Sequence, residues 1–121
     1  MEDRFAELIG HWVQTYWLIA KLLQRCGITI PQANAQTAPG VTRAAVKEAV
    51  EEVKGDPAIP KAARAAVTSA TVKWLATAEI LDNFEDDPAG WREEAIRRFL
   101  VEIHLGSEYA HEELNKRDQV N

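Results

Sequence analysis

The sequence predicts an all-α fold: a four-helix bundle, in up-down-up-down order, with a long loop between its first two helices. Three observations predict it. Apolar residues recur at the three- and four-residue spacing of helices that bury one side. No stretch shows the apolar–polar alternation of a half-buried strand, and glycines and prolines occur where such helices would end or begin. At 121 residues the chain is expected to form one domain, 1–121, with its own core.

The first helix is expected over residues 3–26. Gly27 follows at the position where a left-handed residue commonly ends a helix. The buried stripe of this helix, at helical spacing, consists of Phe5, Leu8, Trp12, Tyr16, Ile19 and Leu23.

Residues 27–40 are expected to form a loop, because the stretch GITIPQANAQTAPG contains two prolines and two glycines. Ile28 and Ile30 should attach its beginning to the core. The loop is longer than most connections in helical bundles. It therefore leaves room for a crossover instead of a simple turn, and it could cover part of the first helix.

The second helix is expected over residues 42–54, with Thr42 as its N-cap. The third is expected over residues 60–83, with Pro60 in its first turn, where the missing N–H group costs nothing. Its core stripe is rich in alanine, which allows a neighbouring helix to approach closely.

The fourth helix is expected over residues 88–116, with Asp87 as its N-cap. Its core stripe consists of Ala95, Ile96, Phe99, Leu100, Ile103, Ala110 and Leu114. Gly106 and Ser107 lie on the same side and indicate a close helix crossing or a kink.

Composition and charge limit the class of protein. One cysteine, Cys26, excludes an internal disulfide framework and is typical of a reducing compartment. The acidic N-terminus is unlike a signal peptide, and polar residues interrupt the apolar part of the first helix too often for a membrane span. A cytoplasmic location and no membrane association are therefore expected.

The net charge of −5 is unevenly distributed. Residues 77–121 carry five basic and twelve acidic groups, which makes this part a poor match for nucleic acid. Residues 40–76 carry six basic and four acidic groups. Their basic residues form a stripe on each of two helices, and this pattern predicts sequence-independent contact with an RNA or DNA backbone: Arg43, Lys47, Lys54, Lys61 and Arg64.

The fourth helix carries two of the three histidines. Seven-residue spacing places Arg97, His104 and His111 along one side, with Glu108 close by. The spacing from Arg97 or Arg98 to His104 resembles the Arg–His motif of HEPN ribonucleases. The asparagine that commonly follows the arginine in that family is missing here. The resemblance implies a catalytic role for this side of the helix.

Two further patterns involve carboxylates. EYAH, residues 108–111, resembles the Glu-x-x-His unit of ferritin-like di-iron bundles, but that architecture needs the unit twice. EAVE at 48–51 and EILD at 79–82 resemble the magnesium-binding motifs of MazG-like nucleotide pyrophosphatases. Because most of these carboxylates are expected opposite the core stripes, they should be solvated. Neither a metal nor a cofactor is therefore expected.

The first helix is apolar on more sides than one buried stripe requires. Trp17 and Leu18 point away from that stripe, and Val13 and Leu22 widen the apolar band. A helix that is apolar nearly all round is expected to be covered nearly all round, and tryptophan is typical of interface hot spots. These four residues are therefore the predicted surface for another copy or another protein subunit.

Taken together, the residues predict a non-catalytic helical adaptor that packs against partners through its first helix and contacts nucleic acid through the basic stripes. In size, helicity and basic stripes the chain is similar to the small subunits of CRISPR ribonucleoprotein complexes. The alternative is a small helical-bundle enzyme, HEPN-like or metal-dependent, that uses Arg97, His104, Glu108 and His111 on RNA or a nucleotide.

Overall fold

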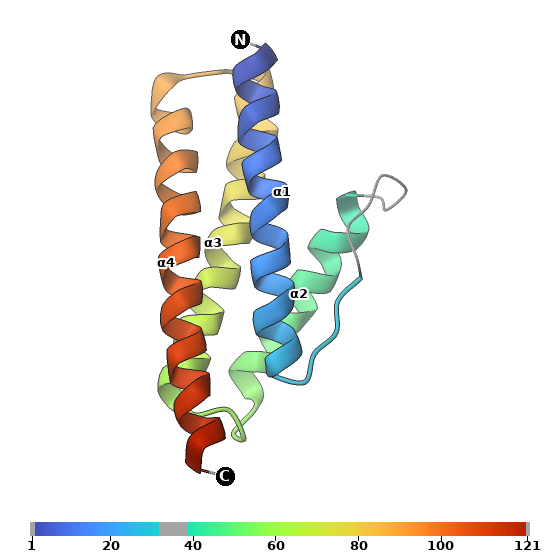
Figure 1. Cartoon of the computed structure of the whole chain (residues 1–121). Helices are drawn as coiled ribbons and strands as arrows, with labels where there is room; N and C mark the ends of the chain where they lie inside the picture. The colour runs from blue at the N-terminus through green and yellow to red at the C-terminus, as the bar shows by residue number, and fades with distance from the viewer. Residues whose placement is uncertain (1, 32–38, 121) are drawn as a thin grey trace.

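The computed structural model describes residues 2–31 and 39–120, and these residues form four helices that pack against one another (Figure 1). Their bounds are α1 Glu2–Arg25, α2 Pro39–Gly55, α3 Lys61–Asp86 and α4 Gly90–Val120. The predicted all-α class is confirmed. No helix in the described part of the chain is both long enough and apolar enough to cross a membrane.

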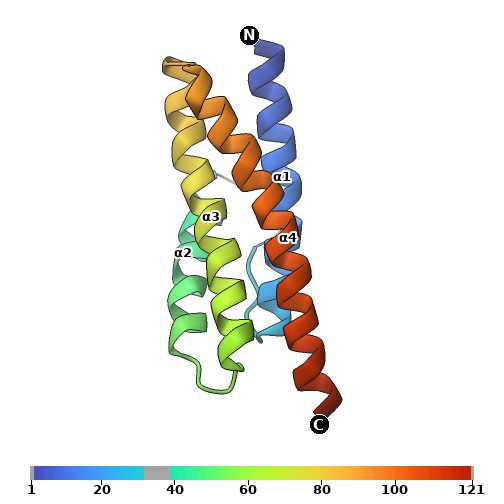
Figure 2. The same cartoon turned by 90° about the vertical axis from the view of Figure 1, so that its left-hand side faces the viewer.

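The helices do not alternate in direction as the sequence predicted. In Figures 1 and 2, α1 and α2 run the same way, α3 returns, and α4 again follows the direction of α1. The start of the α1–α2 connection explains how two consecutive helices come to be parallel. The Tyr16 hydroxyl donates a hydrogen bond to the Pro31 carbonyl, so the chain has already turned back along α1 by residue 31. The rest of the predicted loop, 32–38, lies outside the described residues.

Gly27 ends α1 as predicted. It has a positive φ of 84°. Its N–H bonds the Gln24 carbonyl at 3.0 Å, and the Ile28 N–H bonds the Leu23 carbonyl at 2.9 Å, which is the pattern of a glycine C-cap. Ile30 is buried and Ile28 packs against the core, so both attach the connection to the bundle as expected.

The other helix ends differ from the prediction by a few residues. α2 begins at Pro39, so Thr42 is a buried residue inside the helix and not its N-cap. Pro60 precedes the first residue of α3. Asp87 closes α3 through a bond from its N–H to the Asn83 carbonyl, and α4 begins three residues later. The Asp87 carboxylate accepts a bond from Arg92 at 2.8 Å, and Asp87 is not the N-cap of α4 as the sequence predicted.

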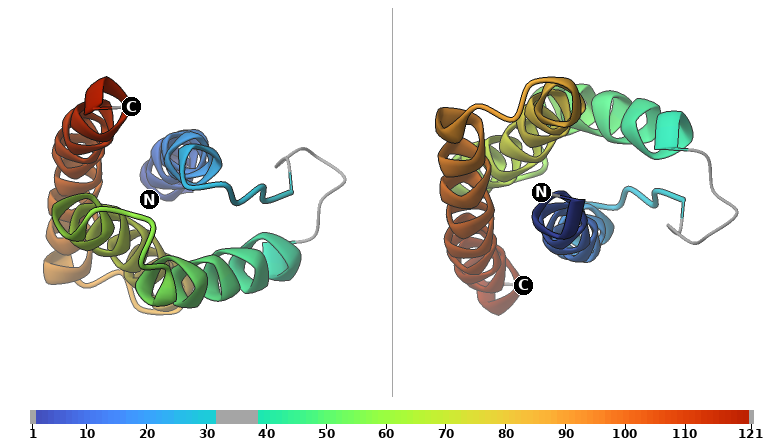
Figure 3. Two further views of the ribbon diagram at one scale, coloured as in Figure 1. Left: turned by 90° about the horizontal axis from the view of Figure 1, so that it is seen from below. Right: turned by 90° about the horizontal axis from the view of Figure 1, so that it is seen from above.

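α3 is the central helix and packs against each of the other three. Seen from below or above, α2, α3 and α4 form a curved layer, and α1 lies on its concave side (Figure 3). Trp12 of α1 stacks on Trp74 of α3 with ring centroids 4.6 Å apart. Each indole N–H points to the other residue's carbonyl, at 3.2 and 3.4 Å. This pair joins α1 to α3 and belongs to the core as the sequence predicted for Trp12.

Gly106 marks the close approach of α4 to α3. A Cβ atom at this position would lie 3.8 Å from the Cβ of Ala70. Ser107 beside it is buried. The predicted close crossing is therefore present, with a small residue on each helix.

Candidate functional site

The outward side of α1 carries large apolar groups. Trp17 keeps 46% of its surface exposed and Val13, one turn earlier, 40%. Gln14 and Lys21 around them are also exposed, whereas Tyr16 and Ile19 are buried. Trp17 therefore lies on the side of α1 that faces away from α3 and α4.

Two of the four residues predicted for partner binding on α1 are placed differently. Leu22 is fully buried in the core, so its assignment to an exposed surface is wrong. It belongs to the main core cluster, which the width of the apolar band did not reveal. Leu18 is half-buried. We call Val13 and Trp17 the α1 outer patch.

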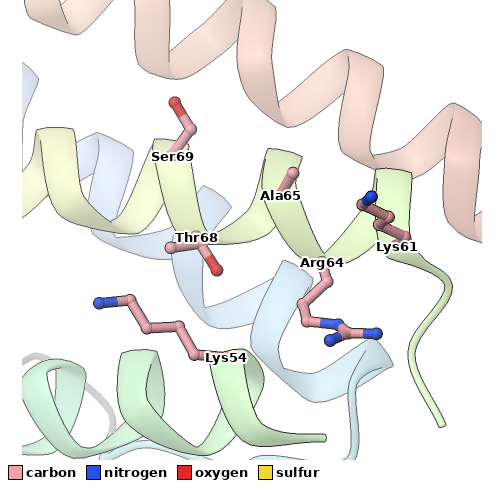
Figure 4. Close-up of a pocket in the computed structure, with 6 residues that line it drawn as sticks. All are labelled: Lys54, Lys61, Arg64, Ala65, Thr68 and Ser69. Carbon is pink, nitrogen blue, oxygen red and sulfur yellow. The ribbon is translucent and has the colours of Figure 1, made fainter. Parts of the chain in front are cut away.

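The structure brings three of the five predicted basic residues together. Lys54 at the end of α2 and Lys61 and Arg64 at the start of α3 line one shallow hollow (Figure 4). Thr68 and Ser69 complete its polar lining. Figure 4 shows the Thr68 hydroxyl directed toward α2, while Lys61 and Ser69 point away from it. The cations are thus spread along the hollow and do not converge on one point, an arrangement that suits an extended polyanion better than a single ion.

Several groups in this hollow are incompletely paired. Arg64 donates one bond, to the Ile59 carbonyl at 3.1 Å, and its buried Nε finds no partner among the described residues. Lys54 lies 3.7 Å from Glu51, in an exposed pair that contributes little. Pro60, at the N-cap position of α3, provides no side-chain cap, and the N-terminal end of a helix attracts anions.

Arg43 serves the fold and lies outside this hollow. Its guanidinium donates two bonds to the Asp82 carboxylate of α3, at 2.7 and 3.0 Å, and stands 5.6 Å from the centre of the Trp12 ring. The hydrogen bonds from Arg43 lower the pKa of the Asp82 carboxyl. Lys47 is exposed and does not line the hollow. The three basic residues predicted on α2 therefore have different surroundings: Arg43 binds Asp82 of α3, Lys47 is exposed, and Lys54 lines the hollow.

Arg97 and His104 share a second shallow hollow, between α4 and α1, with His11, Leu100 and Val101. The Arg97 guanidinium is held by two carboxylates, Glu93 at 3.2 Å and Glu7 of α1 at 3.4 Å. His104 is exposed on the rim. Arg97 and His104 thus line the same hollow, while the Arg97 guanidinium is bound by Glu93 and Glu7, and its pair with Glu7 joins α4 to α1.

His111 and Glu108 are not part of that hollow. The Nδ1 atom of His111 accepts a bond from Arg25 of α1 at 2.9 Å, and the same guanidinium reaches Asn115 at 2.9 Å and Asp118 at 2.8 Å. Burial, with Arg25 and Lys21 nearby, lowers the pKa of His111. This histidine is thus a neutral acceptor in the network that ties the end of α1 to the end of α4.

The carboxylate motifs do not form a metal centre in the described part of the chain. Glu48, Glu51 and Glu79 are exposed, as expected, and Asp82 is bound by Arg43. Among the described residues, no three His, Cys, Asp or Glu side chains are grouped so as to hold a metal ion. Burial raises the pKa of the half-buried Cys26 thiol, which keeps it in the unreactive protonated form at neutral pH.

The sequence interpretation missed an apolar surface on α4. Val101, Leu105 and Tyr109 are exposed by 58%, 60% and 51% on three successive turns. Their four-residue spacing was the available signal, but it lies opposite the stronger core stripe of the same helix. We call these three residues the α4 outer patch.

Comparison of the chain with protein-family models, with curated proteins and with solved structures finds no significant match. Functional inference therefore depends on the surfaces described above.

Proposed function

We propose that the protein is a non-catalytic helical adaptor, a small subunit that acts by packing an outward helix face against a protein partner. The observation that carries this proposal is the placement of Trp17. Its indole faces away from the bundle beside Val13, whereas the other tryptophan of α1, Trp12, is used in the core.

The size of the exposed ring gives the proposal its physical basis. An aromatic side chain buries some 150–250 Å² when covered, and apolar surface contributes about 25 cal/mol per Å² removed from water. Covering the exposed half of Trp17 would thus favour association by roughly 2–3 kcal/mol before ordering costs. Polar neighbours around the ring, Gln14 and Lys21, match the polar rim that surrounds such anchors.

The roles of two other candidates also favour this proposal over the enzyme alternative. Arg97 and His111 each join α4 to α1, through Glu7 and Arg25 respectively. These contacts give both residues a structural role, so their spacing on α4 has an explanation that requires no catalysis.

A photo-reactive residue at position 17 of the full-length protein tests the adaptor proposal in its native cell, with the same group at exposed Lys47 as control. We expect position 17 to capture one defined protein in stoichiometric amount, with excess wild-type protein as competitor. A double variant, Val13→Ala with Trp17→Ala, should lose that partner and keep its melting temperature. Equal capture from both positions, or full partner binding by the double variant, would contradict the proposal.

A second proposed activity is weak binding of a nucleic-acid backbone in the hollow of Lys54, Lys61 and Arg64. It is supported by the spread of these cations along the hollow, by the Thr68 hydroxyl between the helices, and by the N-terminal end of α3. Phosphate contacts of this kind are independent of sequence and weaken steeply with salt.

Fluorescence anisotropy with a labelled single-stranded oligonucleotide at low salt tests this binding. Lys61→Glu and Lys47→Glu change the net charge equally, but only Lys61 lines the hollow. We expect Lys61→Glu to weaken binding at least about tenfold, and Lys47→Glu several-fold less. Equal losses would indicate diffuse attraction to the whole surface, and undetectable wild-type binding would remove the hollow from consideration.

A further inference from the structure

The outer side of α4 combines the α4 outer patch with charges at both of its ends. In Figure 2 this helix lies in front, and in both views of Figure 3 it forms one edge of the bundle, so no other helix covers its outer side. Glu94 and Arg98 precede the patch and Glu112 and Lys116 follow it, all exposed on the same side. Glu94, Arg98 and Glu112 form no ion pair with the described residues, and Lys116 pairs only with Glu113 of its own helix, at 2.9 Å.

These charges are arranged symmetrically about Leu105. Arg98 lies seven residues before Leu105 and Glu112 seven after it; Glu94 lies eleven before and Lys116 eleven after. Val101 and Tyr109 lie four residues to either side. When a second α4 is laid antiparallel with the two Leu105 residues opposite each other, every one of these positions meets its counterpart of opposite charge or of apolar character.

We propose that a second copy of this chain binds on the outer side of α4, antiparallel, with the two-fold axis at Leu105. Leu105 packs on Leu105, and Val101 packs on Tyr109 from each side. Arg98 pairs with Glu112, and Glu94 with Lys116, twice each because the interface is isologous. A parallel arrangement would instead place Arg98 on Arg98 and Glu112 on Glu112, which like-charge repulsion disfavours.

One pair in this register carries like charges. Glu102 and Glu108, three residues to either side of Leu105, also come opposite each other. Lys73 of α3 lies 3.6 Å from Glu102 and supplies a cation at that place. Trp91 and Gln119, fourteen residues to either side, form the outermost pair.

The contact is one helix wide, which sets its expected strength. From Glu94 to Lys116 the helix extends about 33 Å at 1.5 Å per residue. A seam of that length and width falls near the lower end of protein interface sizes, where complexes are transient. Association in the micromolar range is therefore expected.

This proposal concerns a different face from the α1 outer patch and names a different partner, so the two can fail separately. Sedimentation equilibrium of the full-length protein measures self-association in the wild type and in three charge variants: Arg98→Glu, Glu112→Arg, and the two changes combined. Each single change places like charges together at two sites of the dimer, and should weaken self-association at least about tenfold. The combined variant restores opposite charges in the antiparallel register and should recover most of the wild-type affinity.

Two controls show whether a loss of association is specific to α4 and whether each variant remains folded. Lys47→Glu alters an exposed charge away from α4 and should leave the dissociation constant unchanged. Thermal melting of each variant, at protein concentrations far below the dimerisation range, should match the wild type because Lys47, Arg98 and Glu112 are all exposed. A monomeric wild type overturns the dimer, as does equal association by all variants. Loss of association in Val13→Ala with Trp17→Ala, but not in Arg98→Glu, would also overturn it and would assign self-association to α1. Failure of the combined variant to recover would contradict the register.

Discussion

Each side of α1 carries a tryptophan, and the two tryptophans have different surroundings. Trp12 is stacked on Trp74 at 4.6 Å and shares reciprocal indole–carbonyl bonds with it. Trp17, five residues later, keeps nearly half of its surface in solvent. The difference shows that side-chain type alone does not distinguish a core residue from a surface residue in a helical bundle. The direction in which each residue points, relative to the neighbouring helices, separates them.

The same contrast holds for α4. Its inner side carries Ile96, Ile103 and Leu114, all fully buried, while its outer side exposes Val101, Leu105 and Tyr109. Because Val101, Leu105 and Tyr109 are exposed in the bundle, they contribute little to its core. An outer surface of that character is typical of an association site.

Replacing each of the two tryptophans of α1 in turn should give the largest difference in the free energy of unfolding. Trp12→Ala should lower the free energy of unfolding by roughly 3 kcal/mol, because it leaves a cavity beside Trp74 and removes the indole N–H that bonds the Trp74 carbonyl. Trp17→Ala should change it by less than about 0.5 kcal/mol, as for most exposed positions. Urea unfolding followed by circular dichroism measures both at low protein concentration. Similar losses in the two variants would mean that Trp17 also supports the fold.

A smaller effect is expected from the two cations of α2. Arg43→Met should cost about 1 kcal/mol, since it removes the bidentate pair with Asp82 and the contact with the Trp12 ring. Lys47→Met, with a solvated side chain, should have almost no effect. The same unfolding assay distinguishes them, and equal effects would show that Arg43 is only a surface charge.

The smallest effect concerns pH and the joint between α1 and α4. The pKa of His111 is lower in the folded protein than its usual value near 6.5. The unfolded chain therefore binds a proton first, and this histidine should reduce stability as the pH falls below about 6.5. Between pH 7.5 and 5.5, His111→Gln should lose less stability than the wild type, whereas His104→Gln should lose as much as the wild type. Unfolding curves across this range test the sign, and a wild type that gains stability on acidification relative to His111→Gln would contradict it.

Local signals in the sequence predicted the helices well. Gly27 ends α1 because a left-handed residue there closes the last hydrogen bonds, and that preference is visible in the sequence alone. The small residues Gly106 and Ala70 likewise indicated a close crossing. The starts of α2 and α4, for which Thr42 and Asp87 were predicted as N-caps, lie instead at Pro39 and Gly90, three and two residues from the predicted first residues 42 and 88.

The relations between distant residues could not be predicted in this way. The clamp of Arg43 on Asp82 joins positions 39 residues apart and depends on how α2 is set against α3. Leu22 was assigned to the outer side because an apolar band on one helix does not reveal which neighbours cover it. The direction of α2 followed from the Tyr16–Pro31 contact, which a count of loop residues does not imply. The spacing of basic residues identified Lys54, Lys61 and Arg64, which line the hollow. It did not reveal that Arg43 lies apart from them.

The proposed dimer depends on the outward apolar face of α4, with Leu105 at its centre. Sedimentation velocity of the full-length wild type, across concentrations that span the micromolar range, tests it most directly, alongside Leu105→Glu as an exposed change at the proposed two-fold axis. We expect a sedimentation coefficient that rises with concentration in the wild type and stays at the monomer value in Leu105→Glu, with the same helicity in both. A wild type that sediments as a monomer throughout, or a Leu105→Glu variant that associates equally well, would contradict it.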